Sequence, residues 1–216
     1  MASAALKKLA LEEEVEEFGP RSAGISMTLR EFDEIEFVKF AEGYRYELIN
    51  GVLVVSPTPS AQERGPNDML AYWLLSYRDN HPRGAVLDLT LPEQTVRTPM
   101  NRRRADRLIW AGLGRMPRRR DVATIVAEFV SPGKRNRKRD YEEKRDEYMA
   151  MRVGEYWVID RFDRTMTVFT RSGEKIKARV IREHQTSKTP LLPGFELPLA
   201  ELLAVADACP TDLDDD

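Results

Sequence analysis

The chain has 216 residues, of which 42% are hydrophobic and 32% are charged, and its formal net charge is −2 at pH 7. This length predicts one domain, or one domain with extensions, and this composition allows a soluble globular core. No apolar run approaches the roughly 20 residues of a membrane helix, and the first eleven residues are too polar for a secretory signal. The single cysteine excludes an internal disulfide and a cysteine-based zinc cluster, so we expect a cytoplasmic protein without membrane contact.

The small net charge hides an uneven distribution. Between Arg97 and Arg152 the chain carries 17 lysines and arginines against 8 acidic residues, and the compensating acids lie near both ends. Positive charge concentrated in this way suits a polyanionic substrate. A solvated basic loop would have the same composition, so charge alone does not decide between the two interpretations.

The first half of the chain predicts three helices and one hairpin. Thr28 and Glu31 have the spacing of a capping box, and Asn50-Gly51 between two apolar runs is the strongest short hairpin pattern. The predicted helices span 5–18, 28–38 and 62–80, and the strands of the hairpin span 46–49 and 52–55. The buried face of the third helix is expected to use large apolar side chains, namely Met69, Tyr72, Trp73 and Leu75.

The second half predicts a strand-rich middle between helices. The expected strands span 84–91, 94–97, 105–110, 122–130, 156–160, 165–170 and 176–181, and the expected helices span 137–151 and 198–206. This order predicts an α/β fold in which a mixed sheet lies between helices. We predict a helical extension over 1–26, one main domain over 27–206 and a disordered acidic tail over 207–216.

Two acidic residues stand in apolar, strand-like runs. Asp106 precedes Leu108-Ile109-Trp110, and Glu128 lies within the run from Ala123 to Val130. A buried carboxylate is costly unless it has a partner. Two carboxylates on adjacent strands can hold a hard divalent cation through oxygen, which is the arrangement that a metal-dependent phosphodiesterase needs.

A lysine on the following helix adds to this pattern. Asp140, Lys144 and Tyr148 are spaced four residues apart and therefore share one helical face. An ordinary Asp–Lys pair on a solvated face would have the same spacing. The position of the helix directly after the strand that carries Glu128 favours a functional role.

Together these segments resemble the Uma2 family, a bacterial group with the PD-(D/E)XK restriction-endonuclease-like fold. The resemblance covers roughly residues 27–203, and the order and spacing of its pieces are more specific than any one piece. The matching pieces are 27–32, 44–51, Asp106, 128–132, Arg139-Asp140 with Lys144 and Tyr148, 155–160 and 192–197.

The resemblance implies a role for each matched residue. Asp106 and Glu128 match the acidic positions of the motif and are expected to be metal ligands, with Mg²⁺ as the natural ion and Mn²⁺ as a substitute. Val130 occupies the position where the simplest motif has its lysine, and Lys144 matches the lysine that family members carry on the helix. Glu47 matches an acidic residue of the hairpin and is either a further ligand or a polar residue on an open face.

The sequence departs from the family pattern at three positions. Ala105 replaces the usual proline before the motif aspartate, Glu63 stands where a histidine is frequent, and Arg152 replaces a glycine at the helix end. The change at Glu63 is the one that bears on activity, because a histidine there could contact phosphate or assist water activation.

These observations lead to two hypotheses. The first is a Mg²⁺-dependent endonuclease that hydrolyses phosphodiester bonds in DNA and uses Asp106, Glu128, Lys144 and Glu47. The alternative is a catalytically impaired protein of the same fold that binds nucleic acid or a protein partner. A homodimer is expected only by analogy with endonucleases that cut both strands.

Overall fold

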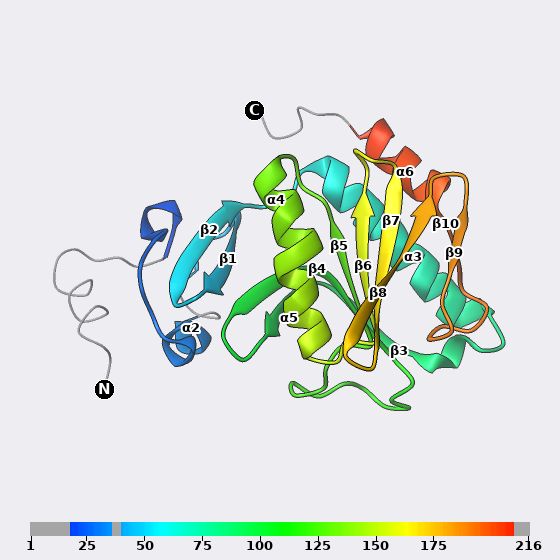
Figure 1. Cartoon of the computed structure of the whole chain (residues 1–216), viewed down its shortest axis with the longest axis horizontal. Coiled ribbons are helices and arrows are strands. Elements are labelled where there is room, and N and C mark those ends of the chain that lie inside the picture. Colours follow the sequence, from blue (N-terminus) through cyan, green and yellow to red (C-terminus); the bar gives the residue numbers. More distant parts are fainter. Residues whose placement is uncertain (1–17, 36–39, 210–216) are drawn as a thin grey trace. The chain divides into compact units, whose positions relative to one another are not determined.

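The computed structural model describes residues 18–35 and 40–209 (Figure 1). The chain divides into two compact units. The N-terminal unit comprises Met1–Thr58 and Thr95–Arg104, and the main unit comprises Pro59–Gln94 and Ala105–Asp216. The helix predicted over 5–18 and most of the predicted acidic tail lie outside the described residues, and the predicted domain boundaries stay a prediction.

The N-terminal unit contains the predicted capping box and hairpin. The backbone N–H of Thr28 donates to Glu31 at 2.8 Å and that of Glu31 donates to Thr28 at 3.2 Å, which confirms the reciprocal cap. Asn50 and Gly51 have φ angles of 51° and 77°, as the tight turn of a two-residue hairpin requires. The elements are η1 (Pro20–Ser22), α2 (Leu29–Ile35), β1 (Tyr44–Ile49) and β2 (Val52–Pro57).

The main unit contains most of the strands and helices. In chain order its elements are α3 (Ala61–Asn80), η2 (Gly84–Val86), β3 (Leu87–Arg97), β4 (Arg102–Ala111), β5 (Ile125–Phe129), α4 (Lys134–Lys138), η3 (Arg139–Glu143), α5 (Lys144–Ala150), β6 (Glu155–Asp160), β7 (Thr165–Ser172), β8 (Lys175–Arg182), β9 (Thr186–Lys188), β10 (Glu196–Pro198) and α6 (Leu199–Ala208). The tip of the β3–β4 hairpin belongs to the N-terminal unit.

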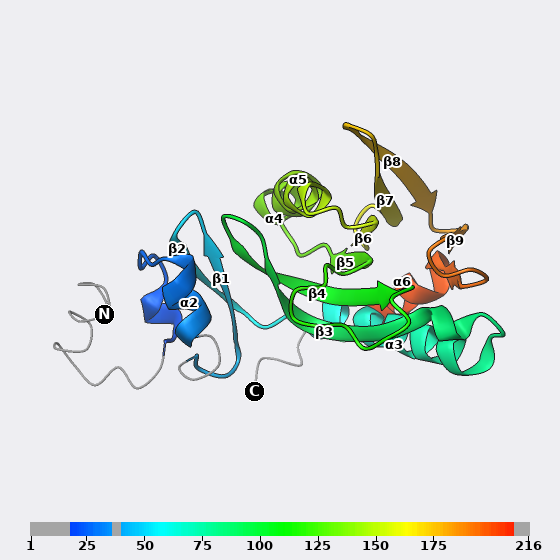
Figure 2. The ribbon, with the colours of Figure 1, turned by 90° about the horizontal axis from the view of Figure 1, so that it is seen from below.

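The sheet of the main unit is mixed, as predicted. Its strands follow the order β3-β4-β5-β6-β7-β8, in which β5 and β6 are parallel and the pairs β4–β5, β6–β7 and β7–β8 are antiparallel. A parallel pair needs a crossover connection, and the α4–η3–α5 segment supplies it. This segment covers one face of the sheet, whereas α3 and α6 cover the other (Figure 2). The predicted α/β fold is therefore confirmed.

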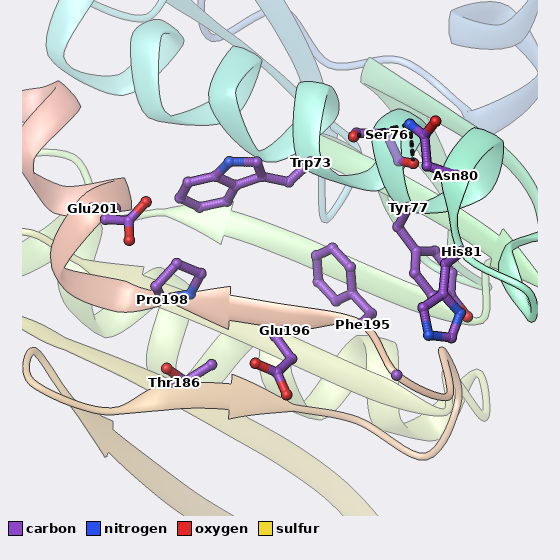
Figure 3. A pocket seen from close by; sticks show the side chains of 11 residues that line it. Trp73, Ser76, Tyr77, Asn80, His81, Thr186, Phe195, Glu196, Pro198 and Glu201 are labelled. Atoms are coloured by element: carbon purple, nitrogen blue, oxygen red, sulfur yellow. Dashed lines mark hydrogen bonds between the residues drawn. The ribbon is translucent and has the colours of Figure 1, made fainter.

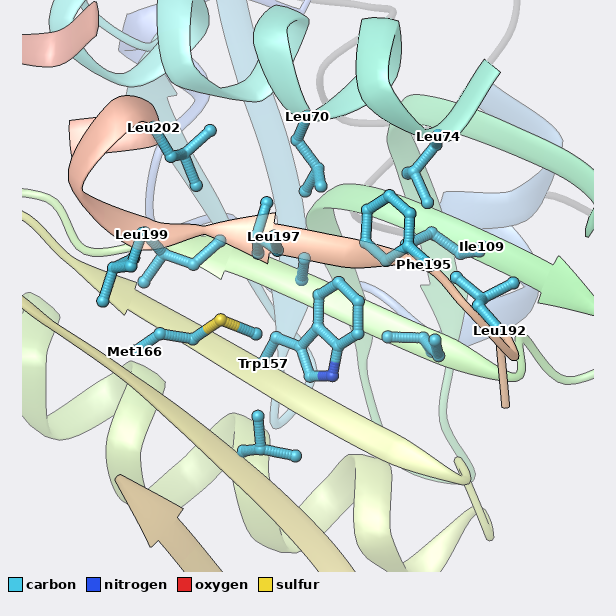
Figure 4. Close-up of a cluster of buried hydrophobic side chains, with 14 of the residues drawn as sticks. Leu70, Leu74, Ile109, Trp157, Met166, Leu192, Phe195, Leu197, Leu199 and Leu202 are labelled. Atoms are coloured by element: carbon cyan, nitrogen blue, oxygen red, sulfur yellow. The ribbon is translucent and has the colours of Figure 1, made fainter. Parts of the chain in front are cut away.

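The core of the main unit lies between the sheet and the pair α3 and α6 (Figure 4). Leu70, Leu74 and Tyr77 form the buried stripe of α3 at helical spacing. The prediction for this face was wrong at Tyr72 and Leu75, which are 65% and 37% exposed. Both apolar stripes fit a helical period, and only the packing of α3 on the sheet selects one of them.

Several boundaries also differ from the prediction. The strand expected at 84–91 begins only at Leu87, because Gly84–Val86 form the 3-10 helix η2. The rest of it joins the strand expected at 94–97 in the single strand β3, because Glu93 adopts a φ of 52° and lets the chain bend without ending the strand. The short strands β9 and β10 were not predicted. Among the described residues, no helix has both the length and the apolar character that crossing a membrane requires.

Candidate active site

Adjacent strands of the main unit bring Asp106 and Glu128 together. Strand β4 pairs with β5 through Arg107↔Ala127 and Leu108↔Val126, and one further step in this register places Asp106 opposite Glu128. Opposed residues of paired strands project from the same face of a sheet. The two acids are 6% and 2% exposed, so both carboxylates are buried.

The crossover helix places Lys144 on this pair of strands. Lys144 Nζ donates to Glu128 Oε2 at 2.8 Å and lies 3.7 Å from Asp140 Oδ1, and Tyr148 donates its hydroxyl hydrogen to Glu128 Oε1 at 3.1 Å. The prediction that these helical residues share one face is confirmed. The alternative of a solvated pair is wrong, because Asp140 and Lys144 are only 1% and 2% exposed.

A π-helical turn lies at the centre of this helix. The turn η3 runs from Arg139 to Glu143 and therefore includes Asp140, and α5 begins at Lys144. Wider turns of this kind occur mostly as single insertions in α-helices and are frequent at functional sites. Here the wider turn contains Asp140 and ends directly before Lys144.

The cluster is electrostatically strained in the absence of a further cation. Burial raises the pKa of Glu128 to about 8; Lys144 opposes this shift, whereas Asp106 and Asp140 reinforce it. Burial also raises the pKa of Asp140, opposed by Lys144 and Arg139. Asp140 Oδ2 is buried without a hydrogen-bond partner among the described residues. Three carboxylates thus face two basic side chains, Lys144 and Arg139.

The donor set fits a hard divalent cation that is only partly coordinated by protein. Within residues 18–35 and 40–209, no three or more histidine, cysteine, aspartate or glutamate side chains converge closely enough to hold a metal. Mg²⁺ is ordinarily held by one or two carboxylates together with water and substrate phosphates. Asp106 and Glu128 meet that requirement as two carboxylates with oxygen ligands.

Comparison with known proteins identifies the family and the fold of the chain. The sequence model of the Uma2 family, described as "Putative restriction endonuclease", matches residues 29–200. The chain belongs to the Uma2 family. Its structure is similar to the crystal structure of "a putative nuclease belonging to DUF820" from Anabaena variabilis, with a TM-score of 0.63, 12% identity and coverage of 84% of this chain and 99% of that one. No curated protein matches the chain. The predicted family and nuclease-like fold are confirmed.

Glu47 lies in the N-terminal unit of the Uma2 chain. Its Oε1 accepts a hydrogen bond from the backbone N–H of Arg104 at 2.9 Å, and the residue is 7% exposed. The alternative of a polar residue on an open hairpin face is therefore wrong. The role of Glu47 as a further ligand stays a prediction.

Two of the three departures from the Uma2 pattern have identifiable structural roles. Glu63 completes the N-terminal cap of α3, since its Oε2 accepts hydrogen bonds from the backbone N–H of Ser60 at 2.9 Å and from its hydroxyl at 3.0 Å. Arg152 follows α5 with a φ of 64°, a left-handed conformation that glycine adopts at lower cost. The replacement of glycine by Arg152 therefore changes the residue that ends this helix and leaves its left-handed conformation in place.

Two residues that the sequence did not single out hold the strand that carries Asp106. On the opposite face of β4, Arg107 donates through Nε to Asn67 Oδ1 at 2.6 Å and through NH2 to the Asn67 carbonyl at 2.9 Å. Asn67 Nδ2 donates to the Asp106 carbonyl at 2.9 Å. Burial lowers the pKa of Arg107 to about 10, although Asp68 and Asp106 oppose the shift. The sequence signal that could have identified Arg107 is a charged residue directly after Asp106 in an apolar strand.

A cavity elsewhere in the main unit has a different chemical character. It has a volume of about 590 Å³ and lies beside α3 and β10 (Figure 3). Trp73, Tyr77 and Phe195 give it aromatic walls, and Glu196 and Glu201 add acidic groups. None of the predicted site residues lines this cavity, and its lining residues include no lysine or arginine that could contact phosphate. The cavity is therefore a poor candidate for a nuclease centre.

Proposed function

We propose that this protein is a metal-dependent endonuclease that hydrolyses phosphodiester bonds in DNA. The observation that carries the proposal is the buried cluster of Asp106, Glu128 and Lys144. Burying three ionisable side chains costs stability, and the Asp140 carboxylate increases that cost. A site that binds a cation and a phosphate would explain why these charged side chains are buried, which packing alone does not explain.

In this proposal Asp106 and Glu128 hold Mg²⁺, with Mn²⁺ able to replace it. When bound, the ion would supply an activated water and stabilise negative charge on the phosphate oxygens. The backbone N–H of Phe129 donates to Asp106 Oδ2 at 2.6 Å, which orients that carboxylate toward its role as a ligand. Glu47 is proposed as a further acidic ligand on the basis of the family resemblance.

Lys144 is proposed to stabilise the charge that develops during phosphodiester hydrolysis. Its ammonium group is held 2.8 Å from Glu128 Oε2, and Tyr148 holds the other oxygen of the same carboxylate. A cation held in place before the reaction stabilises the transition state without reorganisation. Lys144 would act on a phosphate oxygen or orient the attacking water.

The first turn of the crossover helix is proposed to bind the DNA backbone. Lys134, Arg135 and Lys138 of α4 are exposed, and among the described residues they form no ion pair. Arg137 instead pairs with Asp160 and Asp163, and Arg139 pairs with Asp140. Contacts to phosphate position a protein on DNA without selecting its sequence.

The experiment is a plasmid-nicking assay with Mg²⁺, Mn²⁺ or EDTA. We expect metal-dependent cutting by the native protein and its loss in Glu128→Ala. The exposed Glu142→Gln on the same helical segment is the control and should cut at the native rate. Equal cutting by the native protein and Glu128→Ala would contradict the proposed centre.

The use of Glu63 as a helix cap favours a second candidate function. If the family histidine is needed for cutting, this chain would bind nucleic acid or a protein partner without hydrolysing it. Salt-sensitive DNA binding in the absence of any cutting with Mg²⁺ or Mn²⁺ would support this alternative. A homodimer remains part of the first proposal, and the molar mass in solution with and without DNA tests it.

A further inference from the structure

The end of the sheet away from β4 carries an exposed ribbon with an unusual charge. We use the name β7–β8 ribbon for residues 170–182, which run from the end of β7 through a turn into β8. In Lys175–Arg182 every residue except Ile181 is exposed, so both faces of this strand are open over most of its length. β8 pairs with β7 and is the last strand in the order of this sheet.

The cations of the ribbon are not neutralised by carboxylates. Its five basic residues are Arg171, Lys175, Lys177, Arg179 and Arg182, and its one acidic residue is Glu174. In the part of the chain that the structure describes, none of the five forms an ion pair. Arg171 and Arg179 donate only to backbone carbonyls, those of Gly173, Met149 and Lys188.

Many other basic residues of the chain have acidic partners. Such ion pairs join Arg30 to Glu34, Arg78 to Asp79, Arg115 to Asp121, Arg145 to Asp146 and Lys188 to Glu196. The ribbon therefore carries a local surplus of positive charge that the ion-paired parts of the surface do not have. A polyanion is the partner that such a surplus attracts.

The spacing of the basic side chains along β8 fits duplex DNA. The duplex carries one negative charge for about every 1.7 Å of its axis. Lys175, Lys177 and Arg179 alternate along β8 and thus project from one face, with successive side chains roughly 7 Å apart. That spacing is close to the distance between neighbouring phosphates of one strand.

The ribbon lies in the same unit as the catalytic cluster but apart from it. Strand pairing connects Glu128 to Val158, Val158 to Thr167 and Thr167 to Val180. Three strand spacings place β8 about 14 Å from Glu128, which is less than the width of a duplex. The basic face of β8 is opposite to the face of Glu128, so the ribbon is a separate contact surface.

We propose that the β7–β8 ribbon is a second DNA-contact surface, in which Lys175, Lys177 and Arg179 bind phosphates of duplex DNA. The choice of DNA rests on the proposed function. Lysines also protect edge strands against pairing with other chains, which is the competing explanation for their presence. Only the DNA-contact role predicts that the lysines change the salt dependence of binding.

The test is the affinity for a short DNA duplex in EDTA, measured against salt concentration. The ribbon variant is the double change Lys175→Gln and Lys177→Gln. The control is Arg30→Gln with Arg78→Gln, which removes the same charge from cations that already have acidic partners. EDTA prevents cutting, so binding is measured independently of catalysis, and circular dichroism verifies the fold of both variants.

We expect the slope of log affinity against log salt to decrease by about 1.8 in the ribbon variant, since each lost phosphate contact contributes about 0.9. The affinity itself should fall at least about tenfold near 0.1 M salt, while the control stays near the native value. Native binding with an unchanged ribbon variant, or an equal loss in ribbon and control variants, would overturn the ribbon proposal and leave the proposed function intact. A protein that binds RNA or single strands but not the duplex would also overturn it, whereas failure to cut DNA that is bound would count against the nuclease proposal alone.

Discussion

At the scale of single residues, the defining feature is a buried cluster in which Lys144 contacts Glu128 and lies close to Asp140. Asp106 and Glu128 were detectable because a charged residue in an apolar strand is rare. Lys144 was detectable because it follows the strand of Glu128 on a helix. The burial of Asp140 was not predictable from its spacing, since an Asp–Lys pair four residues apart is equally compatible with solvent.

The raised pKa of Glu128 predicts a pH-dependent stability of the metal-free protein. The pKa is about 8 in the folded protein against 4.5 as its ordinary value, so the folded state binds the proton more tightly. Stability from this group is therefore greatest below about pH 4.5 and falls as the pH rises toward about 8. We expect the free energy of unfolding to fall by about 1–3 kcal/mol across this pH range. This is less than the full pKa shift would give, because Lys144 compensates the charge of the ionised carboxylate.

Urea unfolding in EDTA at pH 5 and pH 8 measures this effect. Glu128→Gln should show a smaller loss than the native protein between the two pH values. Adding Mg²⁺ should stabilise the native protein more at pH 8 than at pH 5, because a cation favours the ionised carboxylate. An identical pH dependence in native protein and Glu128→Gln would contradict the assignment of this shift.

At the scale of elements, turn and cap residues predicted where helices and strands lie along the chain, but not which face of a helix is buried. Thr28 with Glu31, and Asn50 with Gly51, encode their structure locally through hydrogen bonds and backbone conformation. The buried stripe of α3 depends instead on the sheet beneath it. The continuity of β3 depends on the positive φ of Glu93. A positive φ is uncommon for glutamate, so the sequence does not predict it.

The orientation of α3 makes a direct prediction about two apolar residues. Leu70 is fully buried, and Leu70→Ala should lower the free energy of unfolding by about 2–5 kcal/mol. Tyr72 is 65% exposed, and Tyr72→Ala should change it by less than about 0.5 kcal/mol. Chemical denaturation of both variants provides the measurement, and a loss for Tyr72→Ala that equals or exceeds the loss for Leu70→Ala would contradict the orientation of α3 in the structure.

At the scale of the whole molecule, the fold class followed from element order and the family from the order of short motifs. Strands followed by a helix and a further strand imply a parallel crossover, which the structure has between β5 and β6. The sequence could not reveal that the chain forms two compact units, because the second segment of the N-terminal unit is a hairpin tip over Thr95–Arg104. Contacts between distant segments determine such units, and local patterns do not encode them.

The charge distribution of the whole chain could be interpreted only with the structure, which shows which basic residues are paired with acids. The sequence drew attention to the excess between Arg97 and Arg152. Many of those arginines turned out to be paired with acids, as Arg115 is with Asp121 and Arg137 is with Asp160. The ribbon cations lie outside that segment and are unpaired with carboxylates among the described residues.

The measurement that tests the central claim most directly is the Mg²⁺-dependent rate of plasmid cleavage by native protein, Lys144→Met and Lys188→Met. Lys144 lies buried against Glu128, whereas Lys188 is exposed and pairs with Glu196. We predict a loss of roughly 10²–10³-fold for Lys144→Met, the size expected when one preorganised charge-stabilising donor is removed, and near-native cutting by Lys188→Met. Cleavage by folded Lys144→Met at the native rate would contradict a centre formed by Asp106, Glu128 and Lys144.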